Sequence, residues 1–166
     1  GAGVRGDARV INERRAEIPY PQIEVIAFRG SAAVLDPEKQ DVEGRQNQDY
    51  FGNLKAQGWW RLRKRFGLTF AAVDAARKGL PLPADFDPDE IISFSPALPL
   101  LQRLIGELSQ PTYSINGAGK IIINKSPPGT RSPNLGDSVM IRFSGVMPAQ
   151  IVITPDMLKW ARSTRR

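Results

Sequence analysis

The chain has 166 residues, of which 41% are hydrophobic, and its 23 lysines and arginines exceed its 17 aspartates and glutamates to give a formal net charge of +6. This length predicts a single domain with its own core, and the positive charge favours a polyanionic partner such as nucleic acid. The absence of cysteine and histidine excludes disulfides, zinc–thiolate sites, histidine metal sites and histidine-dependent catalytic triads, so any catalysis rests on carboxylates, lysines or hydroxyls.

A helix and a strand are the first elements that the sequence predicts. The segment GAGVRGDARVINERR predicts a glycine-rich turn and then a short polar helix over residues 4–15. The turn lacks the lysine of a phosphate-binding loop, so we interpret it as a strand-to-helix turn whose strand lies upstream of residue 1. Residues 21–30, PQIEVIAFRG, predict a strand of a central sheet, because apolar residues alternate along part of it.

A long helix is expected next, from about residue 48 to residue 66, with a continuation to residue 78 after a break near Gly67. One arc of its helical wheel is apolar and is expected to face the core; it holds Phe51, Trp59, Leu62 and Phe66. Four basic residues cover the rest, with Trp60 away from the core arc: Arg61, Arg63, Lys64 and Arg65. Basic residues interleaved with aromatics suit a phosphate-contacting surface, and a solvated face is the alternative.

The middle of the chain predicts a loop, a short strand, a helix and a hairpin. The acidic residues of the loop, Asp85, Asp87, Asp89 and Glu90, are interpreted as turn-forming and capping residues, because they lack the spacing of a calcium loop. Residues 91–95 predict a short strand. Ser95 and Pro96 are expected to cap a helix with Leu98, Leu101, Leu104, Ile105 and Leu108 on one face. Residues 112–125 predict a β-hairpin with its turn at residues 116–119.

The last predicted helix has Ser132 as its N-cap and Pro133 at its first position. Its apolar side is formed by Leu135, Val139, Met140 and Phe143, with Ile141 extending it. Asp137 projects among these residues. With the helix starting here, Asp137 lies beyond the first turn, and an acid complements the helix dipole only within that turn. A carboxylate with apolar neighbours needs a cation or a metal as its partner. The residues alone leave open a metal, a salt bridge to an arginine, or an exposed position because the helix lies at an edge. Two-metal hydrolysis needs several converging acids.

Three motifs, taken in chain order, closely resemble the nuclease domain of the large terminase subunits of tailed bacteriophages and prophages. They are N-x-K-A-Q-x-W-W at residues 53–60, ELSQPTY at residues 107–113, and K-x-P-x-G-x-x-S-P-N-x-x-D from Lys125 to Asp137. The resemblance implies an α/β, ribonuclease-H-like nuclease fold, truncated at its N-terminal strands. Residues 1–147 are then a partial nuclease domain and residues 148–166 a C-terminal tail.

The resemblance also implies a function, namely metal-dependent cutting of concatemeric double-stranded viral DNA during packaging. Asp137 would be the last of three metal-binding acids, which would hold Mg²⁺ or Mn²⁺; the other two belong to upstream strands that are not in this chain. Gly136 stands where the family usually has alanine. ATP belongs only to the ATPase domain, which is also absent, and we expect the fragment alone to be inactive.

The partners implied are double-stranded DNA, the portal protein and the small terminase subunit. Candidate DNA contacts are Lys55, Arg61, Arg63, Lys64, Arg65, Lys120, Lys125 and Arg131. No apolar run is long enough to span a membrane and no signal peptide is evident, so we expect a soluble protein of the bacterial cytoplasm. An uncovered sheet edge or apolar face would invite homo-oligomerisation. The alternative function is a non-catalytic nucleic-acid-binding or assembly module of a phage protein.

Overall fold

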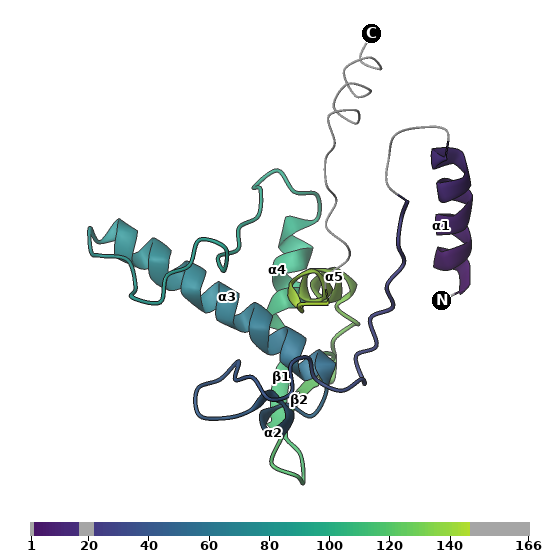
Figure 1. Cartoon of the computed structure of the whole chain (residues 1–166). Coiled ribbons are helices and arrows are strands. Elements are labelled where there is room, and N and C mark those ends of the chain that lie inside the picture. The colour runs from purple at the N-terminus through teal and green to yellow at the C-terminus, as the bar shows by residue number, and fades with distance from the viewer. Residues whose placement is uncertain (1, 17–21, 147–166) are drawn as a thin grey trace. The chain divides into compact units, whose positions relative to one another are not determined.

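The computed structural model describes residues 2–16 and 22–146. These residues fall into two units, one with residues 2–16 and 22–28 and the other with residues 29–146 (Figure 1). The predicted C-terminal tail, residues 148–166, lies outside the described residues. No helix of the described part of the chain is long and apolar enough to cross a membrane.

The first unit consists of helix α1 (Ala2–Arg15) and an irregular segment at residues 22–28. The side chain of Asn12 joins the two, because its Nδ2 donates to the Ile23 carbonyl (2.9 Å) and its Oδ1 accepts from the Ile23 N–H (2.6 Å). The predicted polar helix is confirmed. It begins earlier than expected, so the predicted glycine turn is wrong: Gly3 and Gly6 are helical.

The strand predicted at residues 21–30 is wrong over its described part, because residues 22–30 adopt no strand. A strand is stabilised by ladder hydrogen bonds to a neighbouring strand, whereas here the Ile23 backbone is bound by a helix side chain. Burial is also incomplete, with Ile23 36% and Ile26 41% exposed. The alternating apolar residues therefore pair with no neighbouring strand among the described residues.

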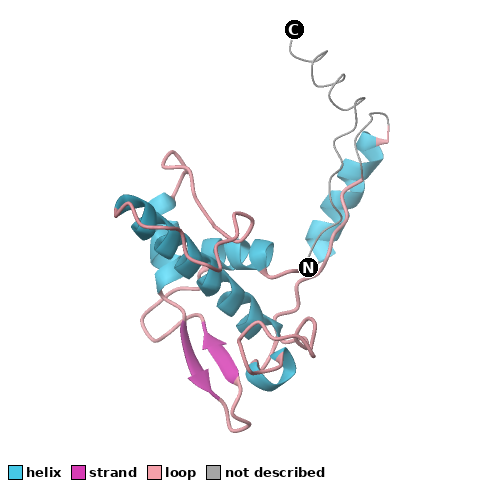
Figure 2. Cartoon of the chain, turned by 60° about the vertical axis from the view of Figure 1, so that its left-hand side comes forward, coloured by secondary structure: helices cyan, strands magenta, loops and turns pink. Residues whose placement is uncertain are grey.

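Helices are the main regular elements of the second unit, and α3 runs through it (Figures 1 and 2). Helix α5 packs against both α3 and α4, and strand β2 packs against α3. The elements of this unit, in chain order, are α2 (Asn47–Tyr50), α3 (Leu54–Arg77), α4 (Leu101–Ser109), β1 (Thr112–Ile115), β2 (Ile121–Asn124) and α5 (Asn134–Phe143).

The predicted hairpin is confirmed. Strands β1 and β2 are antiparallel, with Thr112 opposite Asn124 and Ile115 opposite Ile121. The turn forms locally, because Asn116 Oδ1 accepts from the N–H groups of Ala118 and Lys120. These are the only two strands that the described residues form, so the central sheet expected around residues 21–30 is not found there, and residues 91–95 are also not a strand. The fold is thus mixed, with helices and a small antiparallel sheet that packs against α3.

The long helix differs from its predicted bounds at both ends. Phe51 is extended and Asn53 caps α3, accepting from the Ala56 N–H at 2.9 Å, so the helix begins only at Leu54. It then continues through Gly67 without the expected break. The expected core arc is confirmed in its main members, since Phe51, Trp59 and Leu62 are buried. Trp60 is half-buried among aromatic rings instead of lying apart from the core.

Helix α4 begins later than predicted, at Leu101. Ser95 caps only a turn, in which its Oγ accepts from the Ala97 N–H. Leu98 therefore precedes the helix and is 38% exposed, and Ile105 is 48% exposed, although both were expected on the apolar face. Leu104 is the buried leucine of this helix. Its apolar face is therefore narrower than the spacing of leucines suggested.

Two glycines of α3 should respond to alanine with opposite signs. A Cβ at Gly58 would lie 2.7 Å from Met140 Sδ and 3.3 Å from Ser144 Cβ, whereas a Cβ at Gly67 meets nothing within 4 Å. Gly58→Ala should destabilise the chain by about 1–3 kcal/mol through overpacking. Gly67→Ala, the matched control, should stabilise it by about 0.5–1 kcal/mol through helix propensity. Urea unfolding measures both, and equal effects would contradict the close approach of α3 and α5.

Candidate functional site

The N-terminus of α5 is capped by a side chain from another helix. Pro133 occupies the N-cap position and makes no side-chain cap hydrogen bond, so the predicted N-cap Ser132 is off by one residue. Instead Glu107 of α4 accepts from the N–H groups of Leu135 (2.6 Å) and Gly136 (3.1 Å) through one carboxylate oxygen. Free N–H groups at a helix start need such partners. Glu107 thereby caps the start of α5.

Glu107 is a buried carboxylate, only 9% exposed. Its other oxygen accepts from Arg103 Nε at 2.8 Å. Burial raises the pKa of Glu107, but the hydrogen bonds from Arg103, Gly136 and Leu135 outweigh it and hold this pKa below its ordinary value. Glu107 is therefore ionised at neutral pH, and its charge faces the positive end of the α5 dipole. A Cβ at Gly136 would lie 3.3 Å from the Glu107 carbonyl oxygen, so the helices approach closely.

Asp137 lies in the first turn of α5. The expectation that it lies beyond that turn is wrong, because α5 begins at Asn134 and not at Pro133. Its N–H donates to the Pro133 carbonyl at 2.7 Å, and its carboxylate is ion-paired with Lys125 Nζ. The Asp137 side chain is 20% exposed, and that of Lys125 33%. The carboxylate thus has a cationic partner and is open to solvent on one side.

The loop between Lys125 and Arg131 is closed by Gln110, at the end of α4. Its Nε2 donates to the carbonyls of Lys125 (2.7 Å) and Arg131 (2.6 Å). Within the loop, the Thr130 N–H and hydroxyl both donate to the Pro127 carbonyl. The loop therefore brings two of the predicted DNA contacts, Lys125 and Arg131, to the same end of α5 as Asp137.

The described residues do not by themselves fit a divalent metal ion. Residues 2–16 and 22–146 contain no group of three acidic side chains placed to hold one, and Asp137 is paired with a lysine. Hard divalent cations such as Mg²⁺ bind several converging oxygen ligands. Asp137 therefore supplies one suitable ligand and not a complete site.

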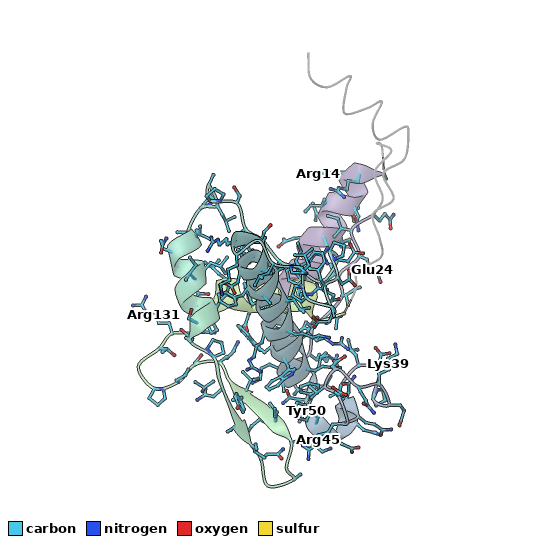
Figure 3. The ribbon with its side chains drawn as sticks, turned by 90° about the vertical axis from the view of Figure 1, so that its left-hand side faces the viewer. Arg14, Glu24, Lys39, Arg45, Tyr50 and Arg131 are labelled. Atoms are coloured by element: carbon cyan, nitrogen blue, oxygen red, sulfur yellow. The ribbon has the colours of Figure 1, made fainter. Side chains whose placement is uncertain are left out.

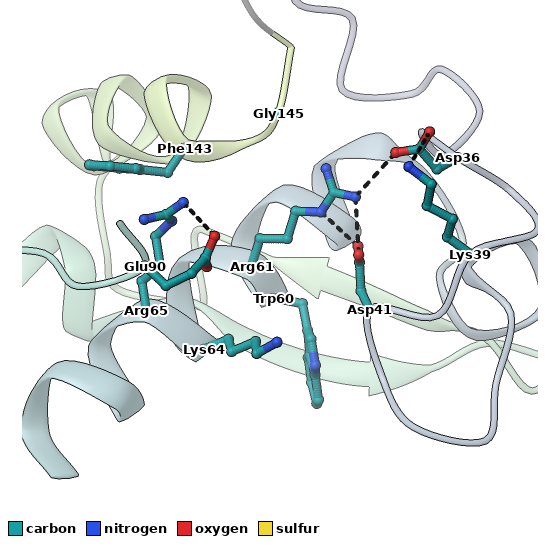
Figure 4. Close-up of a pocket in the computed structure, with 10 residues that line it drawn as sticks. All are labelled: Asp36, Lys39, Asp41, Trp60, Arg61, Lys64, Arg65, Glu90, Phe143 and Gly145. Carbon is teal, nitrogen blue, oxygen red and sulfur yellow. Dashed lines mark hydrogen bonds and ion pairs between the residues drawn. The ribbon is translucent and has the colours of Figure 1, made fainter. Parts of the chain in front are cut away.

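Arg61, another predicted DNA contact, is held by acceptors inside the protein. Its Nε and Nη2 donate to the two oxygens of Asp41 (2.6 and 3.1 Å), and its Nη1 donates to the Ser144 carbonyl (2.8 Å). Burial raises the pKa of Asp41, but hydrogen bonds from Arg61 and Gln57 and the Arg61 charge outweigh it, so the pKa lies below its ordinary value. Arg61 and Asp41 line a cavity of about 350 Å³, and Figure 4 shows the pair with the other lining residues.

Arg65 is similarly occupied. Its Nη2 donates to Glu90 (3.0 Å) and its Nη1 to the Asp89 carbonyl (2.7 Å), and its guanidinium lies 4.9 Å from the centre of the Phe143 ring. The acidic loop thus forms a turn, in which Asp87 accepts from the Asp89 N–H, and it also pairs with α3. Arg61 and Arg65 direct their charge into the protein.

Arg63 and Lys64 are the exposed basic residues of this stretch. The Arg63 guanidinium lies 4.8 Å from the Trp60 ring centre, a stacking that leaves its outer face to solvent. Lys64 has no ion-pair partner within residues 2–16 and 22–146, and it lines the cavity of Figure 4. Tyr113 completes the cluster from β1, with its ring 5.8 Å from that of Trp60.

The predicted DNA contacts do not gather on one surface. Figure 3 shows Arg131 on one side of α3 and Lys39, which lines the same cavity as Lys64, on the other. Lys55 belongs to the first turn of α3, and Lys120 precedes Ile121, whose carbonyl accepts from the Gly52 N–H. The structure therefore separates an Asp137 group with Lys125 and Arg131 from the cluster on α3.

Glu107 and Gln110 were missed as site residues by the sequence analysis, although both lie in the ELSQPTY motif. A signal was present for Glu107, because it follows the buried Leu104 by three residues and so lies on the apolar face of α4. An acid on such a face needs a partner. Its partner, the start of α5, is 28 residues away and was not predictable from spacing.

Comparison with known proteins confirms the resemblance carried by the three motifs. No family model and no curated protein matches this chain. Among solved structures, the nuclease domain of the large terminase subunit gp2 of bacterial virus Sf6 matches with 30% identity and a TM-score of 0.60, over 74% of this chain. A lysine-to-alanine variant of that domain, solved with manganese and β-thujaplicinol, matches over 90% of this chain with 28% identity and a TM-score of 0.69.

The same variant has also been solved with manganese alone, at 29% identity and a TM-score of 0.58. The chain spans 53% to 62% of the length of these solved domains. It is thus similar, in sequence and in fold, to the nuclease domain of a phage large terminase subunit.

Proposed function

We propose that this chain is part of a metal-dependent endonuclease that cuts concatemeric double-stranded viral DNA during phage packaging. The observation that carries the proposal is the placement of Asp137 at the start of α5, between Lys125 and the Glu107 cap, in a fold similar to the Sf6 nuclease domain. The experiment is cleavage of linear duplex DNA by the complete protein that carries this sequence, with and without Mn²⁺ or Mg²⁺.

In this proposal Asp137 is a catalytic residue because it supplies one carboxylate to a Mg²⁺ or Mn²⁺ site. The related Sf6 domain has been solved with manganese and with calcium, which supports a divalent cation. Since the described residues contain no further converging acids, we expect this chain alone to bind Mn²⁺ weakly and not to cleave DNA. In the metal-free chain Lys125 balances the charge of Asp137.

The basic residues are proposed to hold the phosphate backbone, in two groups. Lys125 contacts Asp137 and Arg131 ends the loop that leads to α5, so phosphates bound there are proposed to lie beside the reacting bond. Lys55, Lys120, Arg63 and Lys64 would contact the duplex farther away. Arg61 and Arg65 are the weakest candidates, because each already donates to acidic or carbonyl acceptors of the protein.

This division gives a test on the chain itself. The double variant Arg63→Glu with Lys64→Glu should weaken binding to duplex DNA and lower the slope of log affinity against log salt by about one for each phosphate that is no longer bound. The unfolding free energy should change little, because both side chains are exposed. Fluorescence anisotropy at several salt concentrations measures the binding.

The matched control is the double variant Arg61→Gln with Arg65→Gln, on the same helix. It should lower the unfolding free energy, since Asp41 and the Ser144 carbonyl lose their donors, and it should leave the salt slope unchanged. Unchanged DNA affinity in the Arg63/Lys64 variant would assign those residues to a solvated face.

The remaining parts of the proposal concern partners. We propose the portal protein and the small terminase subunit as partners, and the bacterial host cytoplasm as the location. Homo-oligomerisation is proposed through β1, in which Tyr113 is 58% and Ile115 67% exposed.

The second candidate function is a non-catalytic nucleic-acid-binding or assembly module. The incomplete acid set of the described residues favours it. DNA binding without any metal-dependent cleavage by the complete protein would select this function.

A further inference from the structure

We propose that Glu107 and Gln110 are positioning residues for the reaction, and that together they set the placement of Asp137 relative to Lys125 and Arg131. This inference rests on the proposed function. The two residues, called here the α4 clamp, lie one helical turn apart at the end of α4, and neither contacts a reacting group in the proposal. Each acts through a backbone that carries a site residue.

The first half of the clamp determines the start of α5. Leu135 and Gly136 are the residues directly before Asp137, and their N–H groups both donate to Glu107. Neither Pro133 nor Ser132 provides a side-chain cap, so among the described residues Glu107 is the side chain that satisfies this helix end. Loss of its carboxylate would leave those N–H groups without acceptors and allow the first turn to fray. Asp137 lies in that turn.

The second half of the clamp determines the loop before α5. The single amide nitrogen of Gln110 donates to the carbonyls of Lys125 and Arg131, at 2.7 and 2.6 Å. Both ends of the loop are therefore fixed to the helix that also holds α5. The Lys125 side chain in turn reaches Asp137. One turn of α4 is thus hydrogen-bonded to Lys125, to Arg131 and to the two residues directly before Asp137.

The close packing of the helices supports a positioning role. Met140 of α5 is 2% exposed. Position 136 has no room for a larger residue unless its neighbours shift, since a Cβ there would lie 3.3 Å from both the Glu107 carbonyl oxygen and Trp59. Helix α5 is therefore already packed tightly at Gly136 and Met140. The clamp adds hydrogen bonds that orient the backbone of the first turn, which packing alone does not supply.

The first experiment measures amide hydrogen exchange by NMR in the full chain and in three variants. In Glu107→Ala, exchange at Leu135 and Gly136 should accelerate about tenfold or more, as expected for lost hydrogen bonds to a charged acceptor. In Glu107→Gln the amide oxygen can replace the carboxylate oxygen, so protection should largely return. Ser109→Ala is the control, because its hydroxyl donates to the Ile105 carbonyl within the same helix and not to α5.

The second experiment measures turnover and DNA affinity of the complete protein. Glu107→Ala and Gln110→Met should each lower the cleavage rate at saturating DNA by about tenfold or more. This is the range seen when a residue that orients a metal ligand is removed. The DNA dissociation constant should rise much less than turnover falls, because the proposed contacts Lys55, Lys120, Arg63 and Lys64 lie outside the loop that Gln110 holds. Glu107→Gln should restore turnover. A purely structural role would not separate turnover from affinity in this way.

Unchanged exchange at Leu135 and Gly136 in Glu107→Ala overturns the proposal, as does wild-type turnover in Gln110→Met. If Glu107→Ala does not fold, Gln110→Met alone decides, because it leaves the α5 cap in place. Absence of cleavage by the wild-type complete protein would refute the proposed function. The exchange experiment would still test whether Glu107 sets the first turn of α5.

Discussion

Asp137→Asn in the complete protein is expected to abolish metal-dependent DNA cleavage while the fold stays intact. An amide keeps the shape of the side chain and one acceptor oxygen, but it loses the negative charge that balances a divalent cation. The effect on stability should be small, about 1 kcal/mol or less, because the ion pair with Lys125 is partly open to solvent. Cleavage of linear duplex DNA and thermal unfolding, measured on the same preparation, check both parts.

The matched control is Asp74→Asn. Asp74 is also an acid on a helix with a lysine partner, Lys78 at 2.8 Å, but it is more exposed and lies in the last turns of α3. This variant should retain cleavage. If Asp137 were only a salt-bridge partner, Asp137→Asn would lower stability and retain activity, and that result would refute its catalytic assignment.

The largest loss of stability is expected for Gln57→Leu. Gln57 is fully buried on α3, accepts from the Leu35 N–H (2.7 Å) and donates to the Leu35 carbonyl (3.0 Å) and to Asp41 (2.8 Å). Leucine matches its size but provides none of these bonds. The Leu35 N–H would be left without its acceptor beside an apolar group, so we expect a loss of about 2–4 kcal/mol.

Urea unfolding measures this loss. Gln102→Leu, an exposed glutamine on α4, is the control and should change the unfolding free energy by no more than about 0.5 kcal/mol. Because Asp41 also holds Arg61, Gln57→Leu should in addition loosen the loop at residues 29–46, which amide exchange would detect. Equal unfolding free energies for the two variants would contradict the role of Gln57 as the residue that docks this loop.

The structure gives the N-x-K-A-Q-x-W-W motif a largely structural meaning. Asn53 caps α3, Gln57 holds the loop before it, and Trp59 packs against Gly136 on α5. The motif therefore supports the resemblance to terminase nuclease domains through the packing that places α5. Asp137 is carried by that helix, so the motif and the site are linked by the α3–α5 contact.

The elements that the sequence by itself determined are those with local causes. The hairpin followed from Asn116, whose side chain caps its own turn, and the polar helix α1 and most of α3 followed from residues only a few positions apart. The three motifs, taken in chain order, also identified the similarity to terminase nuclease domains, and they singled out Asp137.

Only the tertiary structure decided the features that depend on distant partners. Residues 22–28 alternate like a strand, yet a strand requires a neighbour, and Asn12 binds that backbone instead. Arg61 and Arg65 look like phosphate ligands until Asp41 and Glu90 are placed beside them. The start of α5, where Asp137 lies in the first turn, is capped by Glu107, which is 28 residues away along the chain. Such partners depend on how distant segments pack together, and residue periodicity along the chain does not predict them.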